Sequence, residues 1–81
     1  MGKRERVRGM ILEVVENVTG YKLEELKRGD DLRLDLGFDE MEFAKIAIEL
    51  EDEFGVEIEE EWSTRMVTVE DLLEAVEELA A

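Results

Sequence analysis

The stretch DLGFDEMEFAKIAIELEDEF, residues 35–54, contains the strongest helix signals in the sequence. Asp39 is a preferred N-cap residue, and Glu42 stands three positions later, as in a capping box. Phe38 and Phe43 take the two positions of a hydrophobic staple across the helix start. The pattern predicts a helix over residues 39–54. Its apolar face is expected to comprise Phe43, Ile46, Ala47, Leu50 and Phe54, widened by Met41, Ala44 and Ile48.

Apolar spacing before this stretch predicts a first helix over residues 3–19. The apolar side chains recur at intervals of three and four residues, which places them on one helical face. Gly20 follows directly, at the position of a left-handed helix cap. Several bases at the helix start oppose the helix dipole, so we expect its first turn to fray. The apolar stripe comprises Val7, Met10, Ile11, Val14, Val15 and Val18.

A last helix is predicted over residues 68–80. Thr68 and Asp71 match a second capping box, and Val67 with Leu72 matches a second staple. The apolar side chains again follow helical spacing and are expected to be buried. They are Val69, Leu72, Leu73, Val76 and Leu79.

The segment between the first two helices, residues 20–38, is predicted to be a long loop. Its alternating leucines suggest a strand, but no second strand-like segment exists to pair with it, so the strand is rejected. One short helical turn is expected in residues 21–26, and a short third helix over residues 59–65, anchored by Trp62. A loop this long is unusual in a compact domain, so we expect leucines to pin it to the core. These anchors are Leu23, Leu26, Leu32, Leu34 and Leu36.

These elements predict one all-α domain over residues 1–81, a four-helix bundle with three main helices, one short helix and a long first loop. A chain of 81 residues has room for one core and no deep cleft. The sequence contains no His and no Cys. A Ser–His or Cys–His nucleophile pair and a thiolate metal site are therefore impossible. Since glycine-rich phosphate-binding motifs are also absent, we do not expect an enzyme.

Charge is distributed unevenly along the chain. The total is -14, and residues 30–61 alone hold 14 acids and two bases. An acidic surface of this kind is either a plain solvated face or a docking surface for basic partners, and both interpretations stay open here. Nucleic acid and anionic membranes are not expected to bind. The carboxylates lack EF-hand spacing, so no dedicated metal site is expected.

No apolar run approaches the length of a membrane span, and no signal peptide is visible. We therefore expect a cytoplasmic protein, and we expect it to be a monomer.

The segment D-L-G-F-D-E-M-E, followed by F-A-K-I-A-I-E-L-E-D-E-F-G-V-E-I, resembles the core signature of acyl carrier proteins. That family shows D-L-G-[AFL]-D-S-L-[DE] and then an acidic helix ending L-E-E-E-F. The match runs without gaps from Asp35 to Ile58, and M-V-T-V-E-D-L-L before the last helix also agrees. The resemblance implies a four-helix carrier fold of fatty-acid or polyketide-type acyl metabolism, whose second helix docks partner enzymes.

Carriers of this family attach 4′-phosphopantetheine to the serine of D-S-L, and the resemblance places Glu40 at that serine. A carboxylate cannot form the stable phosphodiester, and residues 35–50 contain no Ser, Thr, Tyr or Cys to replace it. We therefore expect no cofactor at Glu40. The resemblance further implies that Arg and Lys residues of basic partner enzymes contact an acidic docking face. Its residues are Asp35, Asp39, Met41, Glu42, Glu49, Glu51, Asp52 and Glu53.

Besides an unloaded carrier-fold protein that docks partner enzymes, two alternatives remain open from the sequence. The chain is a Ser-to-Glu variant of a genuine carrier, or it is a stabilised or redesigned carrier scaffold without a native partner. A glutamate at the first helical position is favourable beside the positive end of the helix dipole, and it also places charge near the prosthetic phosphate position. Carrier bundles can also open to hold an acyl chain, but here we expect the candidate lining residues to be plain core. They are Met41, Phe43, Ile46 and Ile48.

Overall fold

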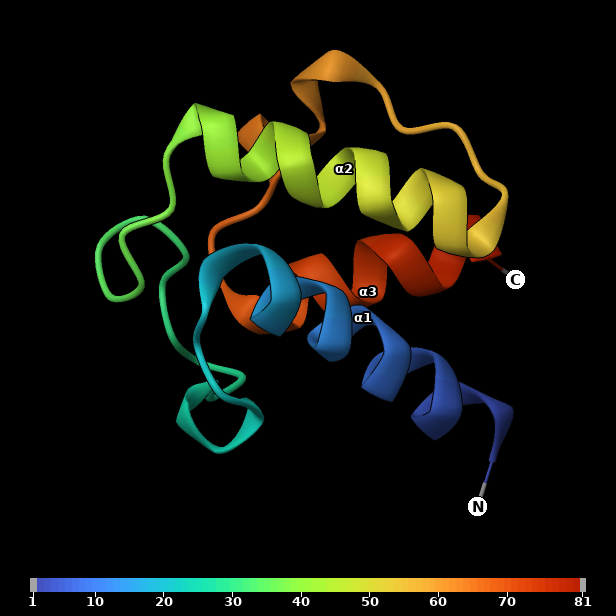
Figure 1. The fold of residues 1–81 in the computed structure, drawn as a ribbon, viewed down its shortest axis with the longest axis horizontal. Helices are drawn as coiled ribbons and strands as arrows, with labels where there is room; N and C mark the ends of the chain where they lie inside the picture. The colour runs from blue at the N-terminus through green and yellow to red at the C-terminus, as the bar shows by residue number, and fades with distance from the viewer. Residues whose placement is uncertain (1, 81) are drawn as a thin grey trace.

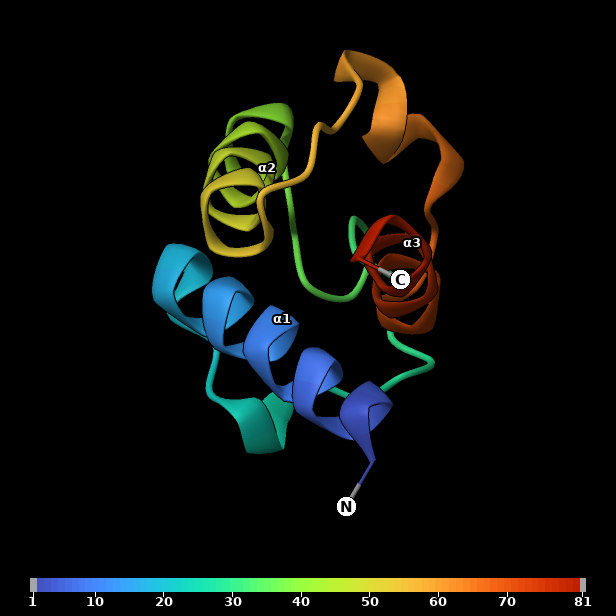
Figure 2. The same cartoon turned by 90° about the vertical axis from the view of Figure 1, so that its right-hand side faces the viewer.

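The computed structural model describes residues 2–80, which fold into a bundle of helices (Figure 1). Figure 2 shows α1, α2 and α3 arranged around one centre, with η2 beside the gap between α2 and α3. Residues 2–80 contain no strand, as the sequence predicted, and η marks a 3-10 helix. The elements are α1 (Lys3–Thr19), η1 (Leu23–Glu25), α2 (Glu40–Phe54), η2 (Glu60–Arg65) and α3 (Val69–Ala80).

The helix boundaries follow the caps that the sequence predicted. The Glu42 backbone N–H donates to Asp39 Oδ1 at 2.8 Å, so Asp39 is the N-cap of α2. Gly55, with φ 66°, ends this helix in the left-handed region that favours glycine. At α3, the Asp71 N–H donates to Thr68 Oγ1 at 3.2 Å, and the Thr68 N–H donates to Asp71 Oδ2 at 3.1 Å. The second capping box is therefore confirmed.

The core lies where the three α-helices face one another. It takes apolar residues from α1, α2, α3, the loop before α2 and the link between η2 and α3, and all of them are less than 9% exposed. The buried residues are Ile11, Val14, Val15, Leu32, Leu36, Phe38, Phe43, Ile46, Leu50, Met66, Val69, Leu72, Leu73 and Val76.

Four apolar residues of the predicted helical faces are exposed instead. Met41 and Ile48 are 67% and 64% exposed, because they lie on the side of α2 opposite the buried Ile46 and Leu50. Their assignment to the core is wrong. Leu79, in the last turn of α3, is 45% exposed, and Val67, a residue of the predicted second staple, is 55% exposed. Ala44 is also exposed.

The loop before α2 is pinned to the core by only some of the predicted leucines. Leu32 and Leu36 are buried and Leu26 is half-buried, but Leu23 and Leu34 are 42% and 86% exposed. The Asp31 carboxylate accepts the backbone N–H groups of Arg33 and Leu34, and the turn that results directs Leu34 into solvent. The prediction that Leu23 and Leu34 are anchors is wrong.

In the segment for which a strand was considered and rejected, the structure has one isolated β-bridge. Asp31 pairs with Thr68 in antiparallel fashion, and the flanking bonds run from Leu32 N to Val67 O and from Val69 N to Asp30 O. The bridge joins the loop to the start of α3 and so fixes the position from which α2 begins.

Candidate functional site: the exposed face of α2

Glu40, the residue that the motif match places at the serine position, is the first residue of α2. Its side chain is exposed, and it follows the N-cap Asp39 directly. Gly37, with φ 71°, turns the chain two residues before the cap, a backbone conformation that favours glycine. The turn and the cap together present residue 40 at the surface.

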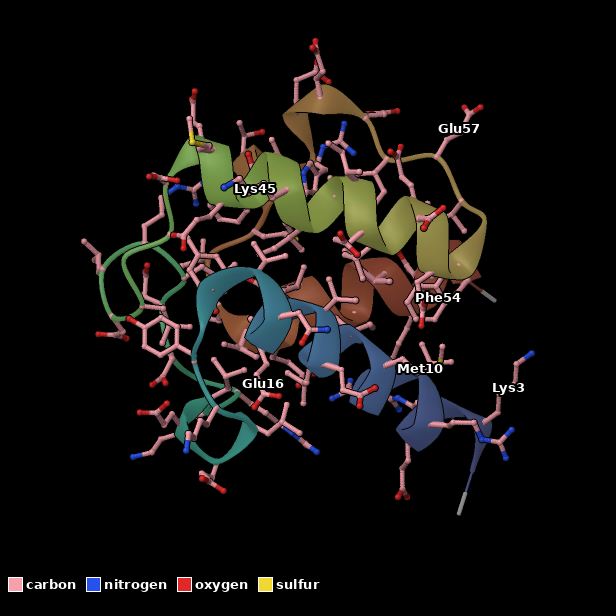
Figure 3. The ribbon with its side chains drawn as sticks, in the orientation of Figure 1. Lys3, Met10, Glu16, Lys45, Phe54 and Glu57 are labelled. Carbon is pink, nitrogen blue, oxygen red and sulfur yellow. The ribbon has the colours of Figure 1, made fainter. Side chains whose placement is uncertain are left out.

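The outward side of α2 combines apolar and acidic side chains. Met41 and Ile48 are seven residues apart, about two helical turns, so they lie on one face. Lys45 lies between them on the helix, and Phe54 marks its far end (Figure 3). We call the exposed residues of this helix the α2 face. They are Glu40, Met41, Ala44, Lys45, Ile48, Glu49, Asp52 and Glu53.

The predicted docking residues divide into two groups. Met41, Glu49, Asp52 and Glu53 belong to the α2 face, and within residues 2–80 their three carboxylates form no ion pair. The sequence prediction omitted Ile48, whose seven-residue spacing from Met41 was the available signal.

Three of the other predicted docking carboxylates also hold the fold, whereas Glu42 is half-buried and its carboxylate forms no ion pair or hydrogen bond within residues 2–80. Asp39 caps α2, and Asp35 Oδ2 accepts the Asp31 N–H at 2.7 Å. Glu51 Oε2 accepts the Ile58 N–H at 2.8 Å, which ties the chain after α2 back to the helix. Substituting one of these residues would therefore change local structure as well as surface charge.

An aromatic cluster lies on the buried side of α2. The ring of Phe43 contacts Phe38 and Trp62 edge to face, with centroid distances of 5.5 and 6.0 Å. The Arg33 guanidinium lies 4.7 Å from the Phe43 ring centre and donates to the backbone carbonyls of Met66 and Ser63. These contacts join the loop, α2 and η2, so the α2 face rests on a fixed platform.

A partly buried ion-pair cluster joins α1 to α3. Arg8 is only 9% exposed, and its guanidinium donates two hydrogen bonds, of 2.9 and 2.7 Å, to the Glu70 carboxylate. It also donates to Glu77 at 3.1 Å, and Arg4 binds the same carboxylate at 2.9 Å. Hydrogen bonding to Glu70 and Glu77 raises the pKa of Arg8, and hydrogen bonding to Arg8 lowers the pKa of each glutamate.

No pattern in the sequence predicts this cluster. The bases at the start of α1 were expected only to weaken its first turn, whereas α1 begins at Lys3 and two of the bases pair with α3. The glutamates that receive them lie more than 60 residues away along the chain.

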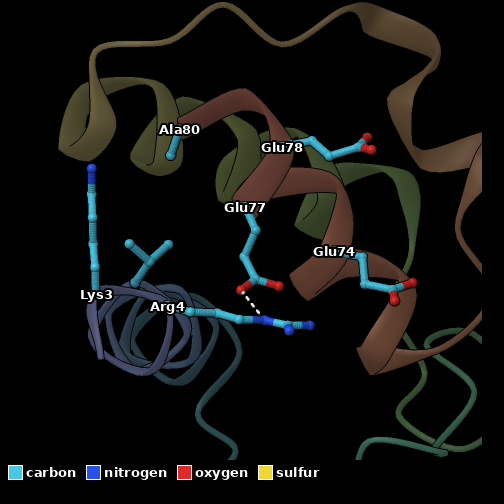
Figure 4. A pocket seen from close by; sticks show the side chains of 7 residues that line it. Lys3, Arg4, Glu74, Glu77, Glu78 and Ala80 are labelled. Atoms are coloured by element: carbon cyan, nitrogen blue, oxygen red, sulfur yellow. Dashed lines mark hydrogen bonds and ion pairs between the residues drawn. The ribbon is translucent and has the colours of Figure 1, made fainter. Parts of the chain in front are cut away.

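A hollow of about 720 Å³ lies between the start of α1 and the end of α3, away from Glu40 (Figure 4). Lys3, Arg4 and Glu77 are among its lining residues, so the Arg4–Glu77 ion pair forms part of its wall. Across residues 2–80, no group of three potential metal ligands gathers. In the same part of the chain, no helix is long and apolar enough to cross a membrane. Any reaction or contact at Glu40 therefore takes place on the exposed surface of the protein.

Comparisons with known proteins agree with this arrangement. The sequence profile of a family described as phosphopantetheine attachment site matches residues 10–76. The acyl carrier protein of Rickettsia bellii (strain RML369-C) is 30% identical over 78 residues, covering 96% of this chain and 91% of that protein. A chloroplastic acyl carrier protein of Brassica napus is 35% identical and covers 83% of this chain, which matches 55% of its length.

A solved structure is also similar. It is a solution structure of the apo doublet acyl carrier protein from prodigiosin biosynthesis, with a TM-score of 0.75 and 27% sequence identity. The similarity covers 91% of this chain and 36% of the doublet.

Proposed function

Because this chain belongs to the acyl carrier protein family, whose profile is that of a phosphopantetheine attachment site, we propose that it docks partner enzymes of acyl metabolism without being loaded itself. Members of the family are carrier domains and not enzymes. The partners are basic enzymes of fatty-acid or polyketide-type pathways, and the docking surface is the α2 face. Because it carries no acyl group, it would occupy the docking sites on partner enzymes that loaded carriers use.

The observation that carries this proposal is the pair of exposed apolar side chains on an acidic helix. Met41 and Ile48 are each about two-thirds exposed, and neither contributes to the core. Glu49 and Asp52 stand beside them without an ion-pair partner among residues 2–80. Apolar anchors among mostly acidic side chains, here with Lys45 as the one base of the α2 face, are typical of an interface in which charge guides the encounter and burial holds the complex.

The absence of loading follows from the chemistry of residue 40. The transferase step forms a phosphodiester when a hydroxyl oxygen of the carrier loses its proton and attacks the pantetheine-side phosphorus of the coenzyme A pyrophosphate, whose P–O bond breaks to release 3′,5′-ADP. A Glu40 carboxylate attacking the same phosphorus would give an acyl phosphate, which hydrolyses readily. The nearest hydroxyl side chains in sequence, Tyr21 and Ser63, are not on α2. Tyr21 also donates its hydroxyl hydrogen to the Leu36 carbonyl at 2.8 Å.

Incubation with coenzyme A and a broad-specificity pantetheinyl transferase tests the proposal. We expect intact mass spectrometry to find the wild-type chain unchanged and the Glu40→Ser variant heavier by one phosphopantetheine. Glu40→Ala is the matched control, because it removes the same charge without adding a hydroxyl. Loading of the wild-type chain would contradict the proposal.

Failure of a folded Glu40→Ser variant to accept the group would instead favour a carrier scaffold without a native partner. The expected monomeric state is checked by light scattering after size-exclusion chromatography, and a dimer would contradict it. A cytoplasmic location stays a prediction, which the distribution of the tagged protein between cell fractions would test.

A further inference from the structure

A second surface lies between α3 and the segment that leads into it. A groove of about 390 Å³ runs between residues 57–66 and the later turns of α3. Apolar side chains from both sides line it, and most of them are incompletely covered; among these, Trp62 is half-buried and Leu79 is 45% exposed. The groove is therefore an apolar depression that the chain itself leaves partly unfilled.

The rim of this groove carries carboxylates that the fold does not use. Two of its five acids are engaged, because Glu59 pairs with Arg65 and Asp71 caps α3. Glu57, Glu74 and Glu78 take part in no ion pair or side-chain hydrogen bond within residues 2–80. The groove therefore has an apolar floor and three uncompensated negative charges at its edge.

Figure 4 shows which acid of α3 binds α1. Glu77 extends toward Arg4 of α1, and the two form an ion pair of 2.9 Å. Glu74 and Glu78 line both this hollow and the groove, and neither forms an ion pair with Arg4. The acids of α3 that bind α1 and the acids that border the groove are therefore different residues.

The free chain is under electrostatic strain at this rim. Glu74 and Glu78 are four residues apart on one helix, a spacing at which like charges repel. Glu78 also lies in the last turn of α3, near the negative end of the helix dipole, and that turn contains no base. A cationic partner placed against these carboxylates would remove both unfavourable terms.

We propose that this groove docks a basic amphipathic helix of a partner protein. An apolar side chain of that helix inserts between Trp62 and Leu79, and its Lys or Arg side chains face Glu57, Glu74 and Glu78. The volume suits one or two inserted side chains and is too small for a whole helix. A second copy of this chain is a poor occupant, because each copy carries a net charge of -14.

The groove and the α2 face belong to different elements, so the chain has two surfaces for basic partners. The α2 face is convex and lies on the outside of one helix, whereas the groove is concave and lies between α3 and residues 57–66. This inference goes beyond the proposed function, because it does not depend on residue 40 or on the α2 face. A chain with both surfaces can bridge two partners.

The sole tryptophan, Trp62, reports on groove occupancy by its fluorescence. The probe is a synthetic peptide of Leu and Lys only, patterned as an amphipathic helix. We expect saturable binding that shifts Trp62 emission to shorter wavelength and weakens as salt is added. The triple variant Glu57→Gln, Glu74→Gln, Glu78→Gln is expected to bind about tenfold more weakly, through the loss of three surface charge pairs.

The matched control is Glu49→Gln, Asp52→Asn, Glu53→Gln, which removes the same charge from the α2 face. We expect it to change affinity by less than about twofold, since only long-range attraction is reduced. Leu79→Asp, a change at a largely exposed position, is expected to weaken binding with the far-ultraviolet circular dichroism unchanged. The proposal is overturned if the two triple variants lose equal affinity, or if the peptide binds and Trp62 emission stays the same.

Discussion

The acidic residues of α3 and of α2 have opposite relations to the rest of the fold. Glu70 and Glu77 of α3 are bound by Arg8, which lies almost buried between α1 and α3. Glu49 and Asp52 of α2 are exposed and form no ion pair within residues 2–80. One set of carboxylates stabilises the bundle, whereas the other leaves its charge available to another molecule.

The same contrast holds for apolar side chains within α2. Ile46 is fully buried, and Ile48, two residues later, is 64% exposed. A helix that served only to complete the bundle would gain nothing from an isoleucine in solvent. The comparison teaches that the α2 face, like the groove beside α3, leaves both charge and apolar area uncompensated, and that a partner is expected there.

The largest effect should come from comparing the two isoleucines. Ile46→Ala is expected to lower the free energy of unfolding by about 2–5 kcal/mol, because it removes buried methylenes and leaves a cavity. Ile48→Ala is expected to change it by less than about 0.5 kcal/mol. Urea denaturation followed by circular dichroism measures both. Equal losses would mean that Ile48 packs against the chain and that the contrast is wrong.

A smaller but clear effect is expected at the ion-pair cluster. Arg8→Ala leaves Glu70 and Glu77 without their shared partner and should destabilise the bundle by about 2–3 kcal/mol. Arg6→Ala is the matched control, since Arg6 lies on the same helix and is exposed. Its expected effect is below about 0.5 kcal/mol. Chemical denaturation of the two variants under the same conditions measures this difference in stability. Similar midpoints would show that the Arg8 cluster adds little to stability.

The pH dependence of unfolding should distinguish the paired acids of α3, Glu70 and Glu77, from the exposed acids of the α2 face. Hydrogen bonding to Arg8 lowers the pKa of Glu70 and of Glu77 in the folded chain. Groups with a lowered folded pKa contribute stability above their unfolded pKa, about 4.3, and this contribution is lost as pH falls through the folded pKa.

Denaturation midpoints should therefore fall with acidification below about pH 4.3, and Glu77→Gln should flatten that dependence. Glu49→Gln, on the α2 face, is the control and should leave the slope unchanged. A slope that the two substitutions alter equally would argue against a special role for the α3 pairs.

The smallest expected effect concerns repulsion along the α2 face. Glu49 and Glu53 are four residues apart, so Glu53→Lys replaces a repulsive pair with an attractive one and should stabilise the chain by about 0.3–0.5 kcal/mol. The same change should weaken docking to a basic enzyme. We expect Glu53→Lys to raise the thermal midpoint and, in a Glu40→Ser chain, to slow loading with phosphopantetheine. Unchanged or faster loading would contradict this expectation.

The sequence predicted those features that are encoded locally. The Asp39 cap and the Thr68–Asp71 box each depend on residues three positions apart, and the structure contains both bonding patterns. Gly20 and Gly55 mark helix ends for an equally local reason, since their positive φ values favour glycine. Fold class and helix boundaries followed from these signals.

Features that depend on distant parts of the chain were not predictable in this way. Arg8 was assigned no role, because its partner glutamates come from a helix at the other end of the sequence. Met41 and Ile48 were assigned to the core, since an amphipathic pattern does not show how wide the buried stripe is. Leu79 faces a groove that exists only because residues 57–66 pass beside α3.

The rate at which a pantetheinyl transferase loads the Glu40→Ser chain tests the central claim most directly. The claim is that the α2 face is an intact docking surface from which only the attachment hydroxyl is missing. We expect Glu40→Ser to be loaded to completion, and Glu40→Ser with Ile48→Asp to keep its fold but lose about tenfold in kcat/KM, equivalent to one apolar contact. A folded Glu40→Ser chain that the enzyme fails to load, or loads equally well with Asp at position 48, would contradict the account.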